Sequence, residues 1–200
     1  MNDKEEIFRG KERFFDIWAP NYDFLLTTVV YGAIHKRLLE YVNFNDSPQV
    51  LDLGCGTGKL LQRLAAKYPA LRGIGLDLSS EMLRVARHNN RYRERLIHVA
   101  GNSENLNFVN RQFNAIFNTI SFLHYPEPEI VLGEISRVLT PGGKYYLADS
   151  ILPVRKITFS PGGLRLYSIG DRETMARRVG LRAIGHYYLL GSVVLSIFTK

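Results

Sequence analysis

The sequence predicts an α/β fold in which seven strands form a mostly parallel sheet, with one antiparallel strand and helices on both faces. From residue 49 onward, short apolar stretches alternate with stretches of helical character, and strands alternating with helices form parallel sheets. The chain ends on two β-rich stretches about Gly191, which indicates a hairpin and one antiparallel strand. Its 200 residues, 46% of them hydrophobic, suffice for one domain with a sizeable core without disulfides.

The first 45 residues are expected to form a helical lid segment, and residues 46–200 the sheet core of the same single domain. Three aromatic residues gather on one side of the first helix: Phe14, Phe15 and Trp18. A break at 19–21 separates this helix from a second one at about 27–42, in which apolar residues recur at helical spacing. Turn-forming residues at 45–48 end the segment.

The sheet core is expected to contain seven strands and four helices. The expected strands are 49–53, 73–77, 96–100, 113–119, 144–149, 181–190 and 192–199. The expected helices are 59–68, 80–90 with Ser79 as N-cap, 128–139 and 171–179. Turn chemistry at 140–143 ends the third helix, and Gly180 ends the fourth. Ligands of such sheets bind at the carboxyl ends of the strands, near the point where the strand order reverses.

Residues 51–59 read LDLGCGTGK and place a glycine-rich loop after the first strand. Gly54, Gly56 and Gly58 lack a Cβ, so the backbone can turn sharply and approach a ligand closely, and the following helix points free N–H groups at that ligand. The dinucleotide pattern G-x-G-x-x-G does not fit, because its third glycine would fall on a lysine or a leucine. The phosphate-loop pattern G-x-x-x-x-G-K-[ST] also fails, since a leucine follows Lys59.

Two aspartates favour a cationic adenosyl ligand over a pyrophosphate. A carboxylate at Asp52 would repel a pyrophosphate by about 1–4 kcal/mol per charge at contact in a surface-like dielectric. It would attract S-adenosylmethionine, which carries an ammonium and a sulfonium. Asp77 ends the second strand 19 residues beyond Gly58, which is the spacing at which an acidic residue accepts from the ribose hydroxyls.

Four successive motifs, VLDLGCGTG, GLDLSSEML, GNSENLNF and ISRVLTPGGKYYLAD, resemble those of class I S-adenosylmethionine-dependent methyltransferases. More narrowly, they resemble the methyltransferase type 11 branch, which includes the ubiquinone/menaquinone-biosynthesis C-methyltransferases. The N-terminal FFDIWAPNYD is similar to that branch as well. The resemblance extends from about residue 14 to the end. It implies a three-layer Rossmann-like sandwich that uses S-adenosyl-L-methionine and releases S-adenosyl-L-homocysteine.

The resemblance also implies which residues hold the cofactor. Those expected around its methionine part are Asp52, Gly54, Cys55, Gly56 and Gly58. Those expected around the adenosine are Asp77 on the ribose and Leu78, Met82, Asn102 and Ser103 on the adenine. The backbone near Asn118 would accept from the ammonium, and Tyr22 would close the site from the N-terminal segment.

The sequence departs from the family pattern at two positions. Relatives usually have aspartate where Asn102 stands, and an aspartate in the strand position of Asn114. Asn102 still offers a side-chain oxygen to the adenine amino group, so weaker discrimination is expected, with binding retained. Asn114 is expected to be structural.

His124 is the residue best placed to act as a general base. Methyl transfer from a sulfonium is an in-line displacement that depends on alignment, and a base is needed only where the acceptor must lose a proton. His124 follows the fourth strand by five residues, on the ligand side; the alternative is that it only lines the pocket or caps a helix. Weaker candidates for this role are Tyr125, Tyr22 and Asp23. Cys55 is not expected to act as a nucleophile, and His98 is expected in the core or at the sheet edge.

Several acceptor classes are disfavoured. The fourth strand ends in Asn118-Thr119-Ile120-Ser121, which is unlike the motif of base-amino methyltransferases, and there is no second cysteine for attack on a pyrimidine. The strand end also lacks acidic residues typical of metal-dependent catechol enzymes, so no metal is expected. The connection 150–170 can cover only a small acceptor, unless the N-terminal helices add to it.

The net charge of +7 includes a basic run at 84–95, which is interpreted as a solvated helix face, so a nucleic-acid partner is not expected. No stretch reaches the roughly 18 apolar residues of a membrane span. Peripheral membrane contact and the oligomeric state stay open. No leader is recognised and there is one cysteine, so a cytoplasmic protein is expected.

The expected function is methyl transfer from S-adenosylmethionine to a small organic acceptor, such as a quinone- or lipid-like ring. The alternative is a non-catalytic S-adenosylmethionine-binding regulator or scaffold of the same fold, which would bind the cofactor without turnover. A nucleotide-sugar or nicotinamide enzyme is disfavoured by the glycine spacing and by Asp52.

Overall fold

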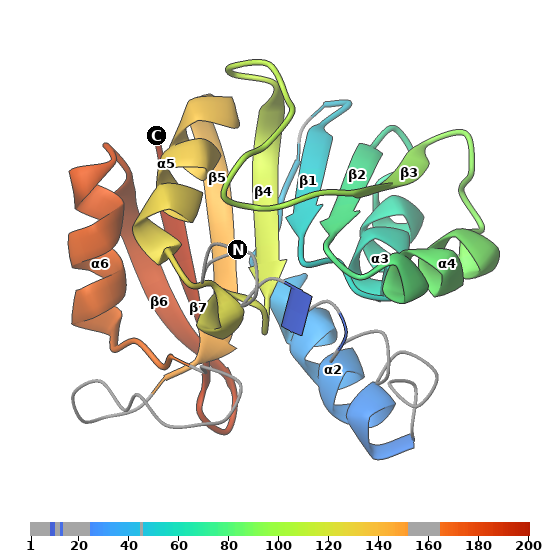
Figure 1. Ribbon diagram of the computed structural model, residues 1–200, viewed down its shortest axis with the longest axis horizontal. Helices are drawn as coiled ribbons and strands as arrows, with labels where there is room; N and C mark the ends of the chain where they lie inside the picture. Colours follow the sequence, from blue (N-terminus) through green and yellow to red (C-terminus); the bar gives the residue numbers. More distant parts are fainter. Residues whose placement is uncertain (1–8, 11–12, 14–24, 45, 152–164) are drawn as a thin grey trace.

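The computed structural model describes residues 9–10, 13, 25–44, 46–151 and 165–200 (Figure 1). The expected aromatic cluster of the first helix lies outside these residues, as do Tyr22 and Asp23. The division into a lid segment at 1–45 and a core at 46–200 therefore stays a prediction. Among the described helices, none combines the length and apolar character that a membrane crossing needs.

Seven strands form one sheet in the order β3-β2-β1-β4-β5-β7-β6. Their bounds are β1 Gln49–Leu53, β2 Arg72–Asp77, β3 Leu96–Ala100, β4 Phe113–Thr119, β5 Leu139–Ser150, β6 Arg182–Leu190 and β7 Val193–Thr199. Strands β1 to β5 pair in parallel, and β7 pairs antiparallel with both β5 and β6. The expectation of a mostly parallel sheet with one antiparallel strand is confirmed. The order reverses between β1 and β4, which places the switch point at their carboxyl ends.

Helices cover both faces of this sheet (Figure 1). The helices are α2 Leu25–Leu38, α3 Lys59–Lys67, α4 Ser80–Asn89, the single-turn η2 Phe122–His124, α5 Pro128–Val138 and α6 Ile169–Arg178. One buried cluster joins the sheet to α5 and α6, and a second joins it to α2 and α3. Along β5 the side chains alternate between the two, since Tyr145 belongs to the first cluster and Tyr146 to the second. A strand buried on both faces reads as continuously apolar.

Local signals account for several helix boundaries. The Ser79 hydroxyl accepts a hydrogen bond from Met82 N at 3.1 Å, which confirms Ser79 as the N-cap of α4. Helix α6 begins earlier than expected, because Ser168 and Asp171 form a capping box with each other's backbone N–H groups. The sequence contains this signal as S-x-x-D at 168–171, and the start expected at 171 did not take it into account.

The turn expected at 140–143 is instead part of β5. Phe113 pairs with Leu139 and Ala115 with Lys144, so the residues between Leu139 and Lys144 form an irregularity within a strand that continues on both sides. The turn-forming Pro-Gly-Gly sequence is therefore accommodated as a bulge. Next to it, the Asn114 side chain accepts from Gln49 N at 2.8 Å, which agrees with a structural role for this asparagine.

The basic run at 84–95 is not simply a solvated helix face. The Arg87 guanidinium donates to the main-chain oxygen of His98 at 2.8 and 3.1 Å. Arg95 donates to main-chain oxygens of Ala65, Tyr68 and Leu71, at and beyond the carboxyl end of α3. These arginines satisfy backbone acceptors that the helix end and the edge strand β3 leave open.

Candidate functional site

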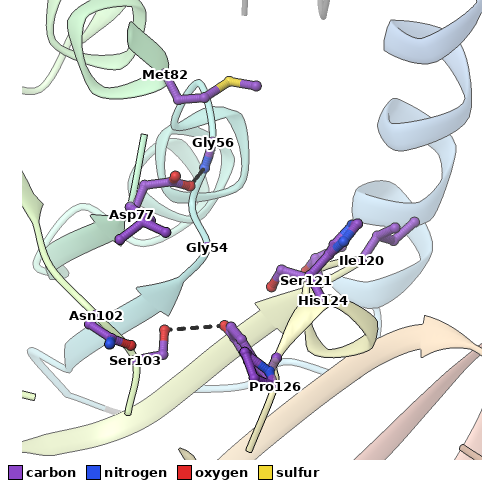
Figure 2. A pocket seen from close by; sticks show the side chains of 13 residues that line it. Gly54, Gly56, Asp77, Met82, Asn102, Ser103, Ile120, Ser121, His124 and Pro126 are labelled. Carbon is purple, nitrogen blue, oxygen red and sulfur yellow. Dashed lines mark hydrogen bonds between the residues drawn. The ribbon is translucent and has the colours of Figure 1, made fainter. Parts of the chain in front are cut away.

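A pocket lies at the carboxyl ends of β1, β2, β3 and β4 (Figure 2). Its first side, the β1–β3 wall, consists of residues at the ends of those strands or in the segments that follow them, including the first turn of α4: Gly54, Gly56, Asp77, Leu78, Met82, Asn102 and Ser103. Its other side, the β4 wall, consists of the last residue of β4, Thr119, and five residues that follow the strand: Ile120, Ser121, His124, Tyr125 and Pro126. All seven residues of the β1–β3 wall were expected from the sequence. Of the β4 wall, His124 was expected and Tyr125 was a weaker candidate.

The glycine loop adopts backbone conformations that favour glycine. Gly54, Gly56 and Gly58 have φ angles of 66°, 50° and 75°, in the left-handed region that side chains disfavour. A Cβ on Gly54 would lie 2.6 Å from Ser121 Cβ, and one on Gly58 would lie 2.7 Å from the His98 ring. The loop therefore packs directly against the β4 wall on one side and against β3 on the other.

Asp77 faces the pocket and is already held by the backbone (Figure 2). Its Oδ2 accepts from Gly56 N at 2.7 Å, and its Oδ1 accepts from Ser79 N at 3.0 Å. Each carboxylate oxygen can accept a second hydrogen bond. Asp77 thus connects the glycine loop to the start of α4, and its side chain lines the pocket.

Asp52 lies behind the glycine loop and is not part of the pocket wall. Its side chain is 2% exposed, and its Oδ2 has no hydrogen-bond partner among the described residues. Burial, reinforced by the nearby Asp77 carboxylate, raises the pKa of Asp52 well above its usual value. A cation near this carboxyl would offset part of that desolvation and favour its charged form.

Three more of the expected cofactor residues also lie behind the pocket surface: Cys55, Gly58 and Asn118. Asn118 Nδ2 lies 2.9 Å from Leu53 O, 2.7 Å from Ser121 Oγ and 2.8 Å from Tyr125 OH. The Asn118 side chain therefore joins the end of β1 to the β4 wall. The role expected near this position, in which the backbone accepts a hydrogen bond from the ammonium of the cofactor, is separate from this structural role of the side chain.

A hydrogen bond of Tyr125 bridges the two walls of the pocket. Ser103 Oγ donates to Tyr125 OH at 3.3 Å, and Figure 2 draws this bond as the dashed line that starts at Ser103. Burial raises the pKa of Tyr125 to about 12, although hydrogen bonds from neighbouring side chains act in the opposite direction. The phenol is therefore neutral at physiological pH and acts here as a hydrogen-bonding group.

The β4 wall contains a backbone conformation that the sequence does not predict. Ile120 has a φ of 50°, which is a genuine outlier for a β-branched residue. Its N–H donates to Ala148 O at 2.8 Å, so the neighbouring strand β5 holds it in place. The turn leads into η2, from which His124 reaches the pocket (Figure 2). The only sequence signal for these residues is their position directly after β4.

The lone thiol and the histidine of β3 lie outside the pocket surface. Burial, with contributions from Asp77 and Asp52, raises the pKa of the Cys55 thiol well above its usual value, which disfavours a nucleophilic thiolate. His98 is 5% exposed, and burial and Arg87 lower its pKa. Its ring fills space beside two glycines, Gly58 and Gly75, as expected of a core histidine. The described part of the chain contains no cluster of three potential metal ligands from His, Cys, Asp and Glu.

Comparison with known proteins identifies the family. Residues 50–143 match the family model of a methyltransferase domain. The chain is 31% identical over 174 residues to a demethylmenaquinone methyltransferase of Chlorobaculum parvum, over 84% of this chain and 68% of that protein. The chain belongs to the class I S-adenosylmethionine-dependent methyltransferases. Within them it falls in the branch of the ubiquinone/menaquinone-biosynthesis enzymes, as the sequence motifs indicated.

A second relative of this methyltransferase supports the same branch. It is a demethylmenaquinone methyltransferase of Thermotoga maritima, 33% identical over 147 residues, over 72% of this chain and 63% of that protein. The chain thus spans about two thirds of the length of these relatives.

Solved structures of low identity show the same fold. A chain from the complex between the Haloferax volcanii methyltransferase activator Trm112 and a methyltransferase has a TM-score of 0.81 at 20% identity, over 92% of this methyltransferase and 96% of that chain. The PH0226 protein from Pyrococcus horikoshii has a TM-score of 0.73 at 20% identity, over 90% of this methyltransferase and 98% of that chain. The [4+2]-cyclase SpnF has a TM-score of 0.75 at 18% identity, over 84% of this methyltransferase and 80% of that chain.

Proposed function

We propose that this protein transfers the methyl group of S-adenosylmethionine to a small organic acceptor with a quinone- or lipid-like ring. The observation that carries the proposal is Asp77: a carboxylate that lines a pocket at the switch point and fixes the glycine loop by accepting from Gly56 N and Ser79 N. The acceptor class is taken from the relatives named demethylmenaquinone methyltransferases.

The residues of the pocket fit the cofactor. Asp77 offers acceptors for the ribose hydroxyls, Leu78 and Met82 offer apolar surface for the adenine, and Asn102 and Ser103 offer polar groups for its edge. Gly54 and Gly56 leave room for the methionine part, because they lack side chains that would fill it. The buried Asp52 carboxyl, whose Oδ2 has no hydrogen-bond partner among the described residues, suits a ligand that carries positive charge. The cofactor supplies the electrophilic methyl group on its sulfonium.

The β4 wall is where the acceptor would lie. We assign His124 the role of holding the proton that a hydroxyl or ring carbon of the acceptor releases, because it reaches the pocket from η2. Tyr125, as a neutral phenol, would orient the acceptor or the wall by hydrogen bonding. Tyr22 would add cover from the N-terminal segment. A metal is not part of the proposal, and the cytoplasmic location stays a prediction.

Binding is tested first, by thermal shift. S-Adenosylhomocysteine is expected to raise the melting temperature, and NAD is expected to leave it unchanged. Asp77→Asn should weaken S-adenosylhomocysteine binding at least tenfold by calorimetry, since two acceptors become one acceptor and one donor. The matched control is Asp46→Asn, at an exposed carboxylate before β1. Stabilisation by NAD alone would overturn the cofactor assignment.

Turnover is tested with labelled S-adenosylmethionine. Demethylmenaquinol analogues and a small-molecule cell extract serve as acceptors, and label is expected in an organic-soluble product. His124→Ala should lower that transfer at least tenfold with S-adenosylhomocysteine affinity unchanged. Label in protein or RNA would contradict the acceptor class.

A second candidate is a binder of the same fold that does not transfer methyl groups. The [4+2]-cyclase with a TM-score of 0.75 is a named activity other than methyl transfer on this fold, and fold alone does not set chemistry. This candidate predicts S-adenosylhomocysteine binding, no label transfer to any acceptor, and no effect of His124→Ala on the measured behaviour.

A further inference from the structure

Asp149 is a buried carboxylate next to the pocket that the proposed chemistry does not use. It lies near the end of β5, is 1% exposed and is not part of the pocket wall. Its Oδ2 accepts from the backbone N–H of Leu123 at 3.0 Å, and its Oδ1 accepts from Ser150 N at 2.7 Å. The first of these bonds crosses from β5 to η2, the turn from which His124 reaches the pocket.

Helix η2 depends on this contact for its N-terminal end. The residue at its N-cap, Ser121, makes no side-chain capping bond. The Ser121 hydroxyl is directed instead to Leu53 O at 3.1 Å and lies 2.7 Å from Asn118 Nδ2. A carboxylate is well suited to the amides that begin a helical turn, because it accepts strongly from N–H groups there. Asp149 thus supplies from another strand the cap that η2 lacks locally.

Asp149 is itself fixed from the opposite side. Arg172 of α6, 2% exposed, donates to Asp149 O at 2.9 Å and to Ser150 O at 3.0 Å. The same guanidinium donates to Val194 O of β7 at 3.1 Å. The end of β5 is therefore tied to both β7 and α6, so the carboxylate that reaches η2 is attached to a rigid part of the molecule.

We propose that Asp149 is a positioning residue that fixes η2 and thereby sets where His124 and Tyr125 stand in the pocket. For its effect on catalysis the inference rests on the proposed function. The geometric part, the cap on η2, is independent of it.

The ionisation of Asp149 provides a readout. Burial raises its pKa to about 6, while Arg172 and the backbone N–H groups of Leu123, Ser150 and Phe122 act in the opposite direction. Tyr145 of β5 is also coupled electrostatically to Asp149. The other ionisable groups on η2, β5 and α6 are His124, Lys144, Tyr146, Asp171, Glu173, Arg177 and Arg178. Below about pH 6 the protonated carboxyl is the weaker acceptor, so its bond to Leu123 N–H should weaken as the pH falls.

The test follows the Leu123 amide by NMR in the ¹⁵N-labelled full chain between pH 5 and 8. In the wild type, the chemical shift of the Leu123 amide is expected to change with a midpoint near pH 6. The chemical shift of the Asp149 carboxyl carbon should change with the same midpoint. Asp149→Asn should abolish that movement. The control is Glu134→Gln, at a carboxylate that accepts from Leu106 N at 2.8 Å away from the pocket, and it should preserve the movement.

Turnover and binding are then compared in the same variants. In Asp149→Asn, labelled methyl transfer is expected to fall at least tenfold, with S-adenosylhomocysteine affinity within threefold of the wild type, because η2 belongs to the β4 wall. A folded Asp149→Asn with wild-type transfer would overturn the positioning role.

The proposal can still be tested if Asp149→Asn does not fold or if no methyl transfer is detected. If Asp149→Asn does not fold, the wild-type titration decides: a Leu123 amide that stays still while the Asp149 carboxyl titrates would overturn the cap. If the wild type transfers no methyl group to any acceptor, the proposed function fails, while the NMR result still tests the cap on its own.

Discussion

The two walls of the pocket are built by different means. The β1–β3 wall follows from signals that lie within a few residues of one another: three glycines with positive φ at alternate positions, and Ser79, whose hydroxyl caps α4 by accepting from Met82 N. The β4 wall contains a strained Ile120, a single helical turn and a cap from Asp149, which is 26 residues from Leu123 in the chain. The first wall is therefore readable as a sequence pattern, whereas the second depends on strands that meet only in the folded sheet.

The largest expected effect comes from Gly54→Ala, which acts where the two walls touch. The new Cβ would lie 2.6 Å from Ser121 Cβ, at a φ of 66°. We expect a loss of about 3 kcal/mol or more of unfolding free energy, measured in urea, and no detectable S-adenosylhomocysteine binding. Gly180→Ala is the control: its φ is 79°, but no atom lies within 4 Å of the new Cβ, so about 1 kcal/mol is expected. Equal losses in both variants would show that the contact between the walls is unimportant.

Asn118→Ala removes the side chain that joins β1 to the β4 wall. It leaves Leu53 O and Tyr125 OH without their Asn118 donor, so a loss of about 2–3 kcal/mol in unfolding free energy is expected. Chemical denaturation measures it. Asn114→Ala, which loses one bond to Gln49 N, should cost about 1 kcal/mol. The comparison between the walls would be weakened if Asn114→Ala were the more destabilising of the two.

Asp52→Asn tests the buried charge behind the β1–β3 wall. The pKa of Asp52 is raised in the folded state, so the folded wild type binds this proton more tightly than the unfolded chain does. Its stabilising contribution is therefore complete below the unfolded pKa of about 3.9 and is lost as the pH rises. The melting temperature of Asp52→Asn relative to wild type should increase from pH 4 to pH 8, at a few degrees for each kcal/mol of stability that the wild type loses. A constant difference across this range, or a decreasing one, would contradict the buried ionisation.

Tyr125→Phe should have the smallest effect. It removes the hydroxyl that bridges Ser103 and Asn118 but keeps the buried ring. A loss of about 0.5–1.5 kcal/mol is expected, measured by thermal unfolding, and S-adenosylhomocysteine affinity should stay within threefold. A loss as large as that of Asn118→Ala would mean that the walls are held together mainly by this phenol.

Sequence patterns were reliable where short-range physics sets the structure. The Ser79 cap, the positive φ of the three loop glycines and the strand at 49–53 follow from residues close to one another in the chain. They failed at 140–143, where turn-forming residues became a bulge because β4 pairs with β5 on both sides of them. They also missed that Arg87 and Arg95 bind main-chain oxygens, since the acceptors come from other elements.

The residues of the chain were sufficient to predict the parallel sheet and the glycine loop, because glycine conformations, helix caps and apolar periodicity are local properties. The family and the other residues of the β1–β3 wall were predicted from the resemblance of four short motifs to those of known methyltransferases. The β4 wall was set by long-range contacts. Ile120 keeps its strained backbone while Ala148 of β5 accepts from its N–H, and η2 keeps its orientation while Asp149 accepts from Leu123. Residues far apart in the chain become neighbours only when β4 and β5 pair, so no short window of sequence contains that information.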